Sequence, residues 1–114
     1  MADFGLFIGW KDAVRGRESK ALEVFNEAVG LYTRLQESGE IESWDAVFLE
    51  PHGGDLNGFM LVRGSAANLA VLADSEEFRD LVTRADMYVR GIGIITGKTG
   101  EGVQRELARF QKFL

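Results

Sequence analysis

The chain has 114 residues, of which 46% are apolar and 27% are charged, and its formal net charge is −5 at pH 7. These values are typical of one globular domain, and size scaling gives about 6,200 Å² of accessible surface for a compact monomer of this mass. The absence of cysteine excludes disulfides, thiolate metal ligands and cysteine nucleophiles. The negative charge disfavours nucleic acid as a partner, because nonspecific affinity for it comes mainly from clustered lysine and arginine.

Targeting and membrane signals are missing from the pattern. The apolar runs are only a few residues long, and Asp3 stands where a signal peptide would carry a basic residue. We therefore expect a cytoplasmic protein that does not span or bind a membrane.

The first half of the chain predicts a strand, a long helix and a second strand. Phe4–Trp10 alternates large residues with glycines, which favours a strand. From Glu18 onward, apolar residues recur at threes and fours and predict one helix closed by Gly39. Residues 41–50 form the next predicted strand, and Pro51, the only proline, suits a strand end or a sheet edge.

The second half predicts a hairpin, a broken helix, a strand and a final helix. A glycine turn leads into a strand over 56–63, antiparallel to the preceding one. Ser65 caps a helical stretch, and Asp74 with Glu77 three residues later predicts a capping box that restarts it. A strand over 89–96 follows, and then a C-terminal helix whose apolar stripe is Val103, Leu107, Phe110 and Leu114.

The element order β-α-β-β-α-β-α predicts an α+β fold of the ferredoxin-like type, βαββαβ with an extra C-terminal helix. In this arrangement the second and fourth predicted strands lie at the sheet edges, which agrees with the position of Pro51. No internal repeat or linker interrupts the pattern. We expect residues 1–114 to form one domain.

Both faces of the predicted sheet are apolar. Alternation along the strands sorts the side chains into two sets. The first is aliphatic and suits packing beneath helices: Leu6, Ile8, Val47, Leu49, Met60 and Val62. The second is largely aromatic: Phe7, Trp44, Phe48, Phe59 and Leu61. The predicted helices cover only one face, so a partner or ligand must cover the aromatic one.

Two strand segments, residues 6–9 and 58–62, resemble the two short motifs of RNA-recognition domains, whose aromatic side chains stack on bases. Phe7 and Phe59 match the stacking positions. However, Asn57 replaces the basic residue that opens the second motif, Leu61 replaces its second aromatic residue, and the net charge is unfavourable. We interpret the match as aromatic strand patterning, with RNA binding as a remote alternative.

The topology, with its long first helix and apolar outer sheet face, resembles the dimeric α+β barrel superfamily over nearly the whole chain. The resemblance implies a homodimer joined through the sheet face with Phe7, Phe48, Phe59 and Leu61. It also implies a pocket between sheet and helices in each subunit. That superfamily includes cofactor-free monooxygenases, haem-degrading monooxygenases and muconolactone isomerases, so the fold alone does not choose a chemistry.

His52 is the only histidine and lies in the predicted hairpin turn. A histidine there can carry protons near neutral pH, which makes it the candidate catalytic residue, although a solvated turn histidine is the simpler interpretation. The candidate substrate-binding residues are Trp10, Trp44, Asn57, Phe59 and Arg63. In this hypothesis the aromatic rings hold the substrate, while Asn57 and Arg63 orient a polar group.

Cofactor and metal signals are weak. One histidine with scattered carboxylates gives no metal-ligand spacing, and no predicted helix carries an axial histidine for haem. Gly97-Lys98-Thr99 lacks the preceding glycine of a phosphate loop, because that position is Ile92. We expect no metal and no cofactor.

The sequence therefore favours a homodimer that binds a small organic compound, whose enzymatic form would be a cofactor-free monooxygenase or isomerase. The alternative is a noncatalytic structural or regulatory homodimer. An aromatic-lined cavity of roughly 300 Å³ or more would favour the first hypothesis, and a filled interior would favour the second.

Overall fold

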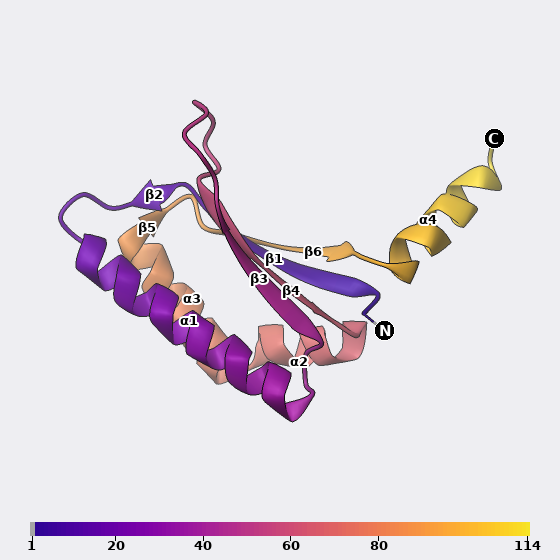
Figure 1. The fold of residues 1–114 in the computed structure, drawn as a ribbon, viewed down its shortest axis with the longest axis horizontal. Helices are drawn as coiled ribbons and strands as arrows, with labels where there is room; N and C mark the ends of the chain where they lie inside the picture. Colours follow the sequence, from indigo (N-terminus) through magenta and orange to yellow (C-terminus); the bar gives the residue numbers. More distant parts are fainter. Residues whose placement is uncertain (1) are drawn as a thin grey trace.

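The computed structural model describes residues 2–114 and contains one four-stranded antiparallel sheet in the order β3-β4-β1-β6 (Figure 1). Its strands are β1 (Phe4–Trp10), β3 (Ser43–Phe48), β4 (Gly58–Gly64) and β6 (Gly93–Lys98). The predicted ferredoxin-like α+β arrangement is confirmed, and so is the edge position of the second and fourth predicted strands, because β3 and β6 are the edges.

The last predicted strand is divided in the structure. Its first residues form β5 (Val89–Arg90), which pairs with β2 (Asp12–Ala13) in a separate two-stranded sheet. The chain then turns at Gly91, whose φ of +68° favours glycine, and enters β6. Periodicity did not predict this break, since two-residue strands leave no repeating pattern.

Glycine and serine residues at the helix ends set where the helices begin and stop. α1 (Glu18–Ser38) stops at Gly39, which has a left-handed φ of +81°, as predicted. α2 (Ala66–Asp74) is capped by Ser65, also as predicted, and is followed by α3 (Glu76–Tyr88). The capping box at Asp74 was wrong by one position, because the Ser75 hydroxyl accepts the hydrogen bond from the Phe78 N–H at 3.2 Å. In residues 2–114, no helix combines the length and apolarity needed to cross a bilayer.

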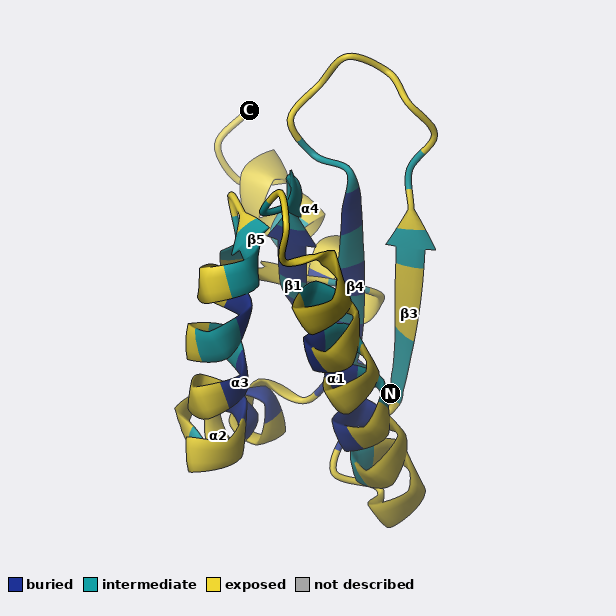
Figure 2. Ribbon diagram, turned by 90° about the vertical axis from the view of Figure 1, so that its left-hand side faces the viewer, coloured by how far each residue is buried: buried dark blue, intermediate teal, exposed yellow. Residues whose placement is uncertain are grey.

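α1, α2 and α3 cover one face of the sheet, which we call the inner face (Figure 2). Its strand residues Leu6, Ile8, Met60 and Val62 are buried, as predicted. They pack against the buried residues of the helices: Val24, Ala28, Leu31, Tyr32, Leu69, Leu72, Phe78, Leu81 and Ala85. This apolar layer is the core of the molecule.

Two ion pairs tie α1 to α3 on the solvent side of this layer. The Arg84 guanidinium donates to both carboxylate oxygens of Glu27, at 2.7 and 2.9 Å, and this hydrogen bonding lowers the pKa of Glu27. Arg34 of α1 pairs with Glu77 of α3. The two helices are thus fixed side by side over the inner face.

The prediction for the two faces of β3 is wrong. Trp44 lies opposite Val62, and Phe48 lies opposite Gly58, so both rings are on the inner face with the helices. Val47 lies opposite Phe59 and therefore belongs to the other face. Because β3 carries apolar residues on both sides, alternation defined its two sets but did not tell which set faced the helices.

The other face, which we call the outer face, carries Val47, Phe59, Leu61, Phe7 and Ile95 on neighbouring strands. The Phe7 and Phe59 rings stack with centroids 5.1 Å apart. Gly9 makes room for this arrangement, since a Cβ there would lie 2.6 Å from the Phe7 ring. No helix of residues 2–114 covers the outer face (Figures 1 and 2).

The C-terminal helix α4 (Glu101–Gln111) follows β6 and projects away from the sheet and the other helices (Figure 1). Apart from Gly102, its residues are exposed or half-buried. It contributes nothing to the core described above.

Candidate ligand cavity

A cavity of about 210 Å³ lies between the inner face of the sheet and helices α1 and α3. It exists because three positions on the helices are alanines, Ala21 and Ala28 on α1 and Ala85 on α3. The remaining lining side chains are all apolar or aromatic: Ile8, Trp10, Ala13, Leu22, Val24, Phe25, Tyr32, Phe48, Met60, Leu81, Val82, Val89 and Ile92.

Three aromatic rings meet at the exposed end of the cavity. The Phe25 and Phe48 centroids are 5.3 Å apart, and the Trp10 ring meets each of them edge-on at 6.1 Å. Phe48 is 69% exposed and Leu22 is 60% exposed, although both line the cavity. The opening therefore lies between α1 and the β3 edge of the sheet, and its rim is apolar.

Glycine at position 58 sets the position of the Trp10 ring. A Cβ at Gly58 would lie 2.6 Å from the Trp10 ring, which rests on the backbone of β4 at this point. Gly58 is opposite Trp10 in the register of β1 and β4, so this contact is built into the sheet. The indole is thus held flat on the inner face beside the cavity.

Tyr32 brings the only hydroxyl group among the lining side chains. It is 1% exposed, and its ring lies 6.0 Å from the Trp44 ring. Burial raises the pKa of the Tyr32 hydroxyl well above its usual range. The hydroxyl is therefore uncharged near neutral pH and can donate or accept a hydrogen bond. The Tyr32 hydroxyl and the Trp10 indole N–H are the two polar groups on the lining side chains.

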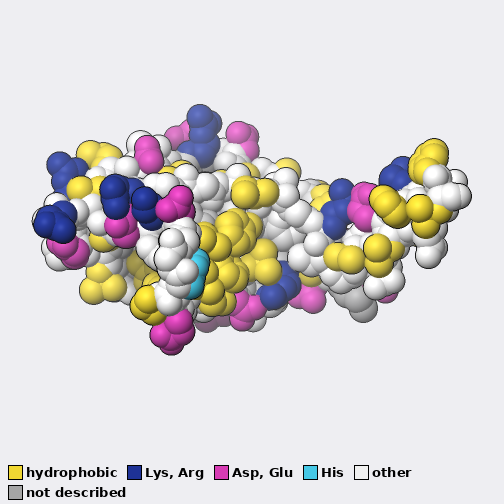
Figure 3. All heavy atoms as spheres, turned by 90° about the horizontal axis from the view of Figure 1, so that it is seen from above, with side chains coloured by type: hydrophobic (Ala, Val, Ile, Leu, Met, Phe, Trp, Pro, Cys, Tyr) yellow, Lys and Arg dark blue, Asp and Glu magenta, His cyan; other side chains and the backbone are white. Residues whose placement is uncertain are grey.

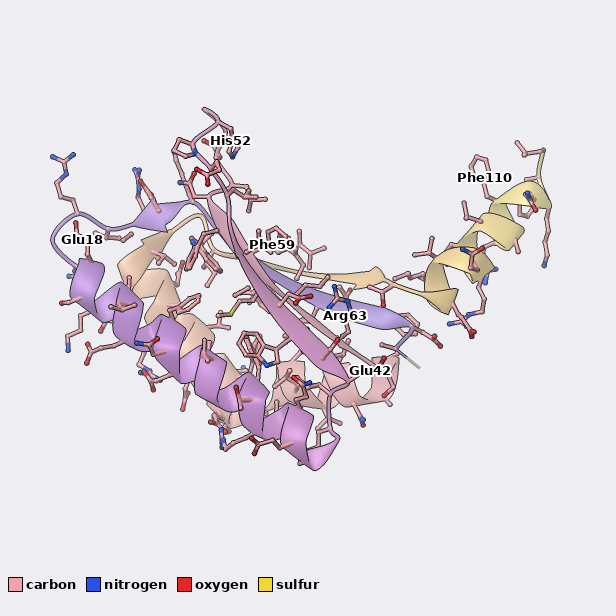
Figure 4. All side chains as sticks on the ribbon, viewed as in Figure 1. Glu18, Glu42, His52, Phe59, Arg63 and Phe110 are labelled. Atoms are coloured by element: carbon pink, nitrogen blue, oxygen red, sulfur yellow. The ribbon has the colours of Figure 1, made fainter. Side chains whose placement is uncertain are left out.

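His52, the predicted catalytic residue, is outside this cavity. It lies in the β3–β4 loop (residues 49–57), which projects beyond the sheet (Figure 4). Its Nε2 is 2.8 Å from the carbonyl oxygen of Leu56, and its Nδ1 accepts a hydrogen bond from the Gly54 N–H at 3.2 Å. These bonds hold the loop's own turn, and the catalytic role of His52 stays a prediction.

The five predicted binding residues do not form one site. Trp10 lines the cavity, and Trp44 lies on the same face behind Tyr32. Asn57 donates from its side chain to the carbonyl of Lys11 and thereby closes the loop onto β1. Phe59 and Arg63 lie on the outer face, on the side of the sheet away from α1 (Figure 4).

Arg63 already has a partner on the outer face. Its Nη1 donates to the Asp45 carboxylate at 2.6 Å, across the β3–β4 pair. An arginine held in this way is a strand-surface ion pair, and it lies on the wrong face to orient a group inside the cavity. Its predicted role toward a substrate remains untested.

Sequence reasoning missed most of the lining, and one signal for it was present. Ala21 and Ala28 are seven residues apart on the apolar stripe of α1, among large residues. Small residues at this spacing leave a gap on one helix face when the neighbours are large. From the sequence, the stripe predicts only the helix itself.

Charged and metal-binding groups are absent from the cavity. No Asp, Glu, Lys, Arg or His side chain is among the lining residues. Within residues 2–114, no group of three or more His, Cys, Asp or Glu side chains is arranged to hold a metal ion. The cavity therefore suits an uncharged molecule, since burying an unpaired charge in apolar surroundings is costly.

No family model matches this sequence, and no curated protein is similar to it in sequence. The fold, in contrast, is shared with solved structures of the dimeric ferredoxin-like type, at low sequence identity. This defines the class of the chain by architecture: a ferredoxin-like α+β protein with a cavity between sheet and helices.

Three of the similar structures show how varied that class is. A dimeric ferredoxin-like protein of unknown function from Jannaschia sp. CCS1 has a TM-score of 0.64 and 13% identity, over 85% of this chain and 97% of its own. The hydroxynitrile lyase from Passiflora edulis has a TM-score of 0.63 and 13% sequence identity, over 89% of this chain and 97% of its own. The cofactor-independent oxygenase SnoaB from Streptomyces nogalater has a TM-score of 0.51 and 13% sequence identity, over 87% of this chain and 93% of its own. At such identities the likeness concerns the fold alone.

Proposed function

We propose that this protein is a homodimer whose subunits each bind a small, uncharged, largely apolar organic compound between the sheet and helices α1 and α3. The observation that carries the proposal is the cavity itself, whose lining contains no charged side chain and only two polar side-chain groups, on Trp10 and Tyr32. Ligand pockets are typically apolar with a few directed polar groups, and this lining has that composition.

The cavity volume limits the size of the ligand. An engineered apolar cavity of about 150 Å³ holds benzene, so the 210 Å³ here suits one substituted ring or a compact terpenoid. This volume is below the roughly 300 Å³ at which ligand pockets typically begin and which would favour ligand binding over a noncatalytic dimer, so only a small ligand fits. A single acceptor, such as a ketone oxygen, would find a donor in the Tyr32 hydroxyl.

The homodimer is supported by the outer face and by the dimeric proteins that share the fold. Phe7, Phe59 and Leu61 lie together there, as the predicted interface requires, and Val47 takes the place given to Phe48. Covering these side chains with a second sheet would remove a continuous apolar surface from water.

A ligand series tests the cavity. The probes are acetophenone, the similarly shaped ethylbenzene, which lacks the acceptor, and benzoate, which carries a charge. We expect the first two to raise the Tm and to change the fluorescence of Trp10 in a Trp44→Phe background, while benzoate does neither. The absence of any effect from a library of neutral one-ring and two-ring fragments, or equal binding of benzoate, would contradict the proposal.

Tyr32→Phe sharpens this test, because it removes the hydroxyl and leaves the ring. Losing one neutral hydrogen bond weakens binding by about 0.5–1.5 kcal/mol, or roughly twofold to thirteenfold. We expect acetophenone to lose this affinity and ethylbenzene to keep its own. Tyr88→Phe is the matched control, because it makes the same change at a tyrosine that does not line the cavity, and it should leave both affinities unchanged.

Turnover is the second candidate, and the match to a cofactor-independent oxygenase supports testing it. The cavity itself favours binding, because the raised pKa of Tyr32 leaves no base among the lining side chains near neutral pH. Oxygen uptake and isomer formation should be measured with each compound that binds. If either occurs, loss of turnover in His52→Gln, with unchanged Tm, would support the predicted proton carrier.

A further inference from the structure

The C-terminal arm (residues 101–114) carries an apolar stripe that is not part of the core formed by the described residues. Val103, Leu107 and Phe110 are spaced by four and three residues and so lie on one side of α4, and Leu114 follows four residues later, just beyond the end of the helix. Leu107 is 53% exposed and Phe110 is 67% exposed. Figure 4 shows Phe110 on a helix that stands clear of the sheet and of α1.

The first turn of the arm is anchored to the body of the subunit. Gly102 is buried, and a Cβ there would lie 2.2 Å from the carbonyl oxygen of Asp3, so only glycine fits. Arg105 pairs with Asp3 at 2.9 Å, and Glu106 pairs with Lys98 of β6 at 3.1 Å. These contacts set the direction in which the arm projects.

The rest of the arm has no such support. In the described part of the chain, no ion pair or side-chain hydrogen bond joins residues 107–114 to another element. Isolated helices shorter than about 12–15 residues are marginal in water, and most helical stability in proteins comes from packing of the apolar face. An 11-residue helix with an unpacked stripe therefore needs a surface to lie on.

The single chain exposes more surface than a compact monomer of its size. Its accessible surface is 7417 Å², against about 6,200 Å² for a compact monomer of this mass. Its radius of gyration is 15.4 Å, against about 13.3 Å for a compact chain of this length. The excess of roughly 1,200 Å² is somewhat more than the 800 Å² or so that each partner contributes to a standard interface.

A second copy of this chain fits the arm best. Each copy has two unpartnered apolar surfaces, the arm and the outer face. When two copies are related by a two-fold axis, the outer faces can pack on each other and each arm can pack on the other copy. Figure 3 shows apolar side chains gathered between the β3–β4 loop, marked by the single histidine, and the arm. The charges also agree: the arm has three cations and two acids, while the rest of the chain has ten cations and sixteen acids.

We infer that the C-terminal arm packs across a second copy of this chain, with its stripe of Val103, Leu107, Phe110 and Leu114 extending the contact made by the outer faces. The inference rests on the proposed homodimer and assigns the arm a role in it. One arm from each copy then encloses the pair of sheets.

Sedimentation equilibrium of three proteins tests this inference: the full chain, a stripe variant (Leu107→Glu with Phe110→Glu), and a control with two glutamates on another side of the same helix (Gln104→Glu with Ala108→Glu). All four positions are exposed in the single chain, so each variant should fold, as circular dichroism will check. We expect the stripe variant to raise the dimer dissociation constant at least about tenfold, because it places charge in an apolar contact. The control should match the full chain.

Phe59→Glu on the outer face separates failure of the arm from failure of the dimer. A full chain that is monomeric at micromolar concentration would overturn both the homodimer and the inference. A dimer weakened by Phe59→Glu, but no more by the stripe variant than by its control, would overturn the role of the arm alone. Binding of the full chain to phosphatidylcholine and phosphatidylglycerol vesicles, lost only in the stripe variant with dimerisation unchanged, would assign the arm to membranes and overturn the inference.

Discussion

Single glycines decide where the aromatic rings of this protein lie. Gly58 allows the Trp10 ring to rest on β4 on the inner face, and Gly9 allows Phe7 to lie beside Phe59 on the outer face. A Cβ at either glycine would come within 2.6 Å of the ring. On both faces, a glycine leaves the space that an aromatic ring occupies. The cavity and the proposed interface both depend on these glycines.

Gly30, unlike Gly9 and Gly58, does not make room for a neighbouring side chain, so it can be replaced. It lies inside α1, it is exposed, and a Cβ there would meet nothing within 4 Å. Gly30→Ala should raise the free energy of unfolding by about 0.5–1 kcal/mol, because glycine loses more backbone entropy in a helix than alanine. Denaturant unfolding followed by circular dichroism measures the change.

Gly39→Ala is the matched control for that substitution. Gly39 also has open space around it, but its φ is +81°. The left-handed conformation costs a non-glycine residue about 1–2 kcal/mol, so this variant should lose stability where Gly30→Ala gains it. If both changes had the same sign, the conformational argument would be wrong.

At the scale of elements, the junction between α2 and α3 turns on one side chain. The Ser75 hydroxyl accepts from the Phe78 N–H and donates to the Leu72 carbonyl at 2.7 Å, so it caps one helix and closes the other. Loss of an N-cap costs typically about 1 kcal/mol. Ser75→Ala should therefore lower the free energy of unfolding by about that amount or more.

Asp74→Ala separates the observed cap from the one that the sequence predicted. Asp74 is exposed and is the last residue of α2. Its replacement should change the free energy of unfolding by less than about 0.5 kcal/mol, as for most surface substitutions. A larger loss for Asp74→Ala than for Ser75→Ala would restore the predicted capping box.

At the scale of the whole molecule, the proposed dimer makes thermal stability depend on protein concentration. Association of folded chains stabilises them by mass action, so the Tm should rise by several degrees over a roughly hundredfold increase in concentration. Scanning calorimetry of the full chain and of Phe59→Glu measures this. The variant should show a weaker dependence, and a flat Tm in the full chain would indicate that the folded species is a monomer.

Local patterns in the sequence determined the elements and their order. The alternation in β1, the stripe and terminal glycine of α1 and the Ser65 cap are local signals, because backbone preferences and capping act over a few residues. The fold class followed from the order of elements. The apolarity of both sheet faces, and hence the expected need for a partner, could also be predicted at this level.

Only the tertiary structure decided which face of β3 meets the helices, and with it the site. Trp44 and Phe48 share a face with α1 because of the register between β3 and β4, which places Trp44 opposite the buried Val62. The cavity likewise needs three alanines on two helices to meet one sheet. His52, Asn57 and Arg63 suggested chemistry by residue type, yet their bonds close a loop and pair two strands. Residue type states what a side chain can do, but distance and burial decide what it meets.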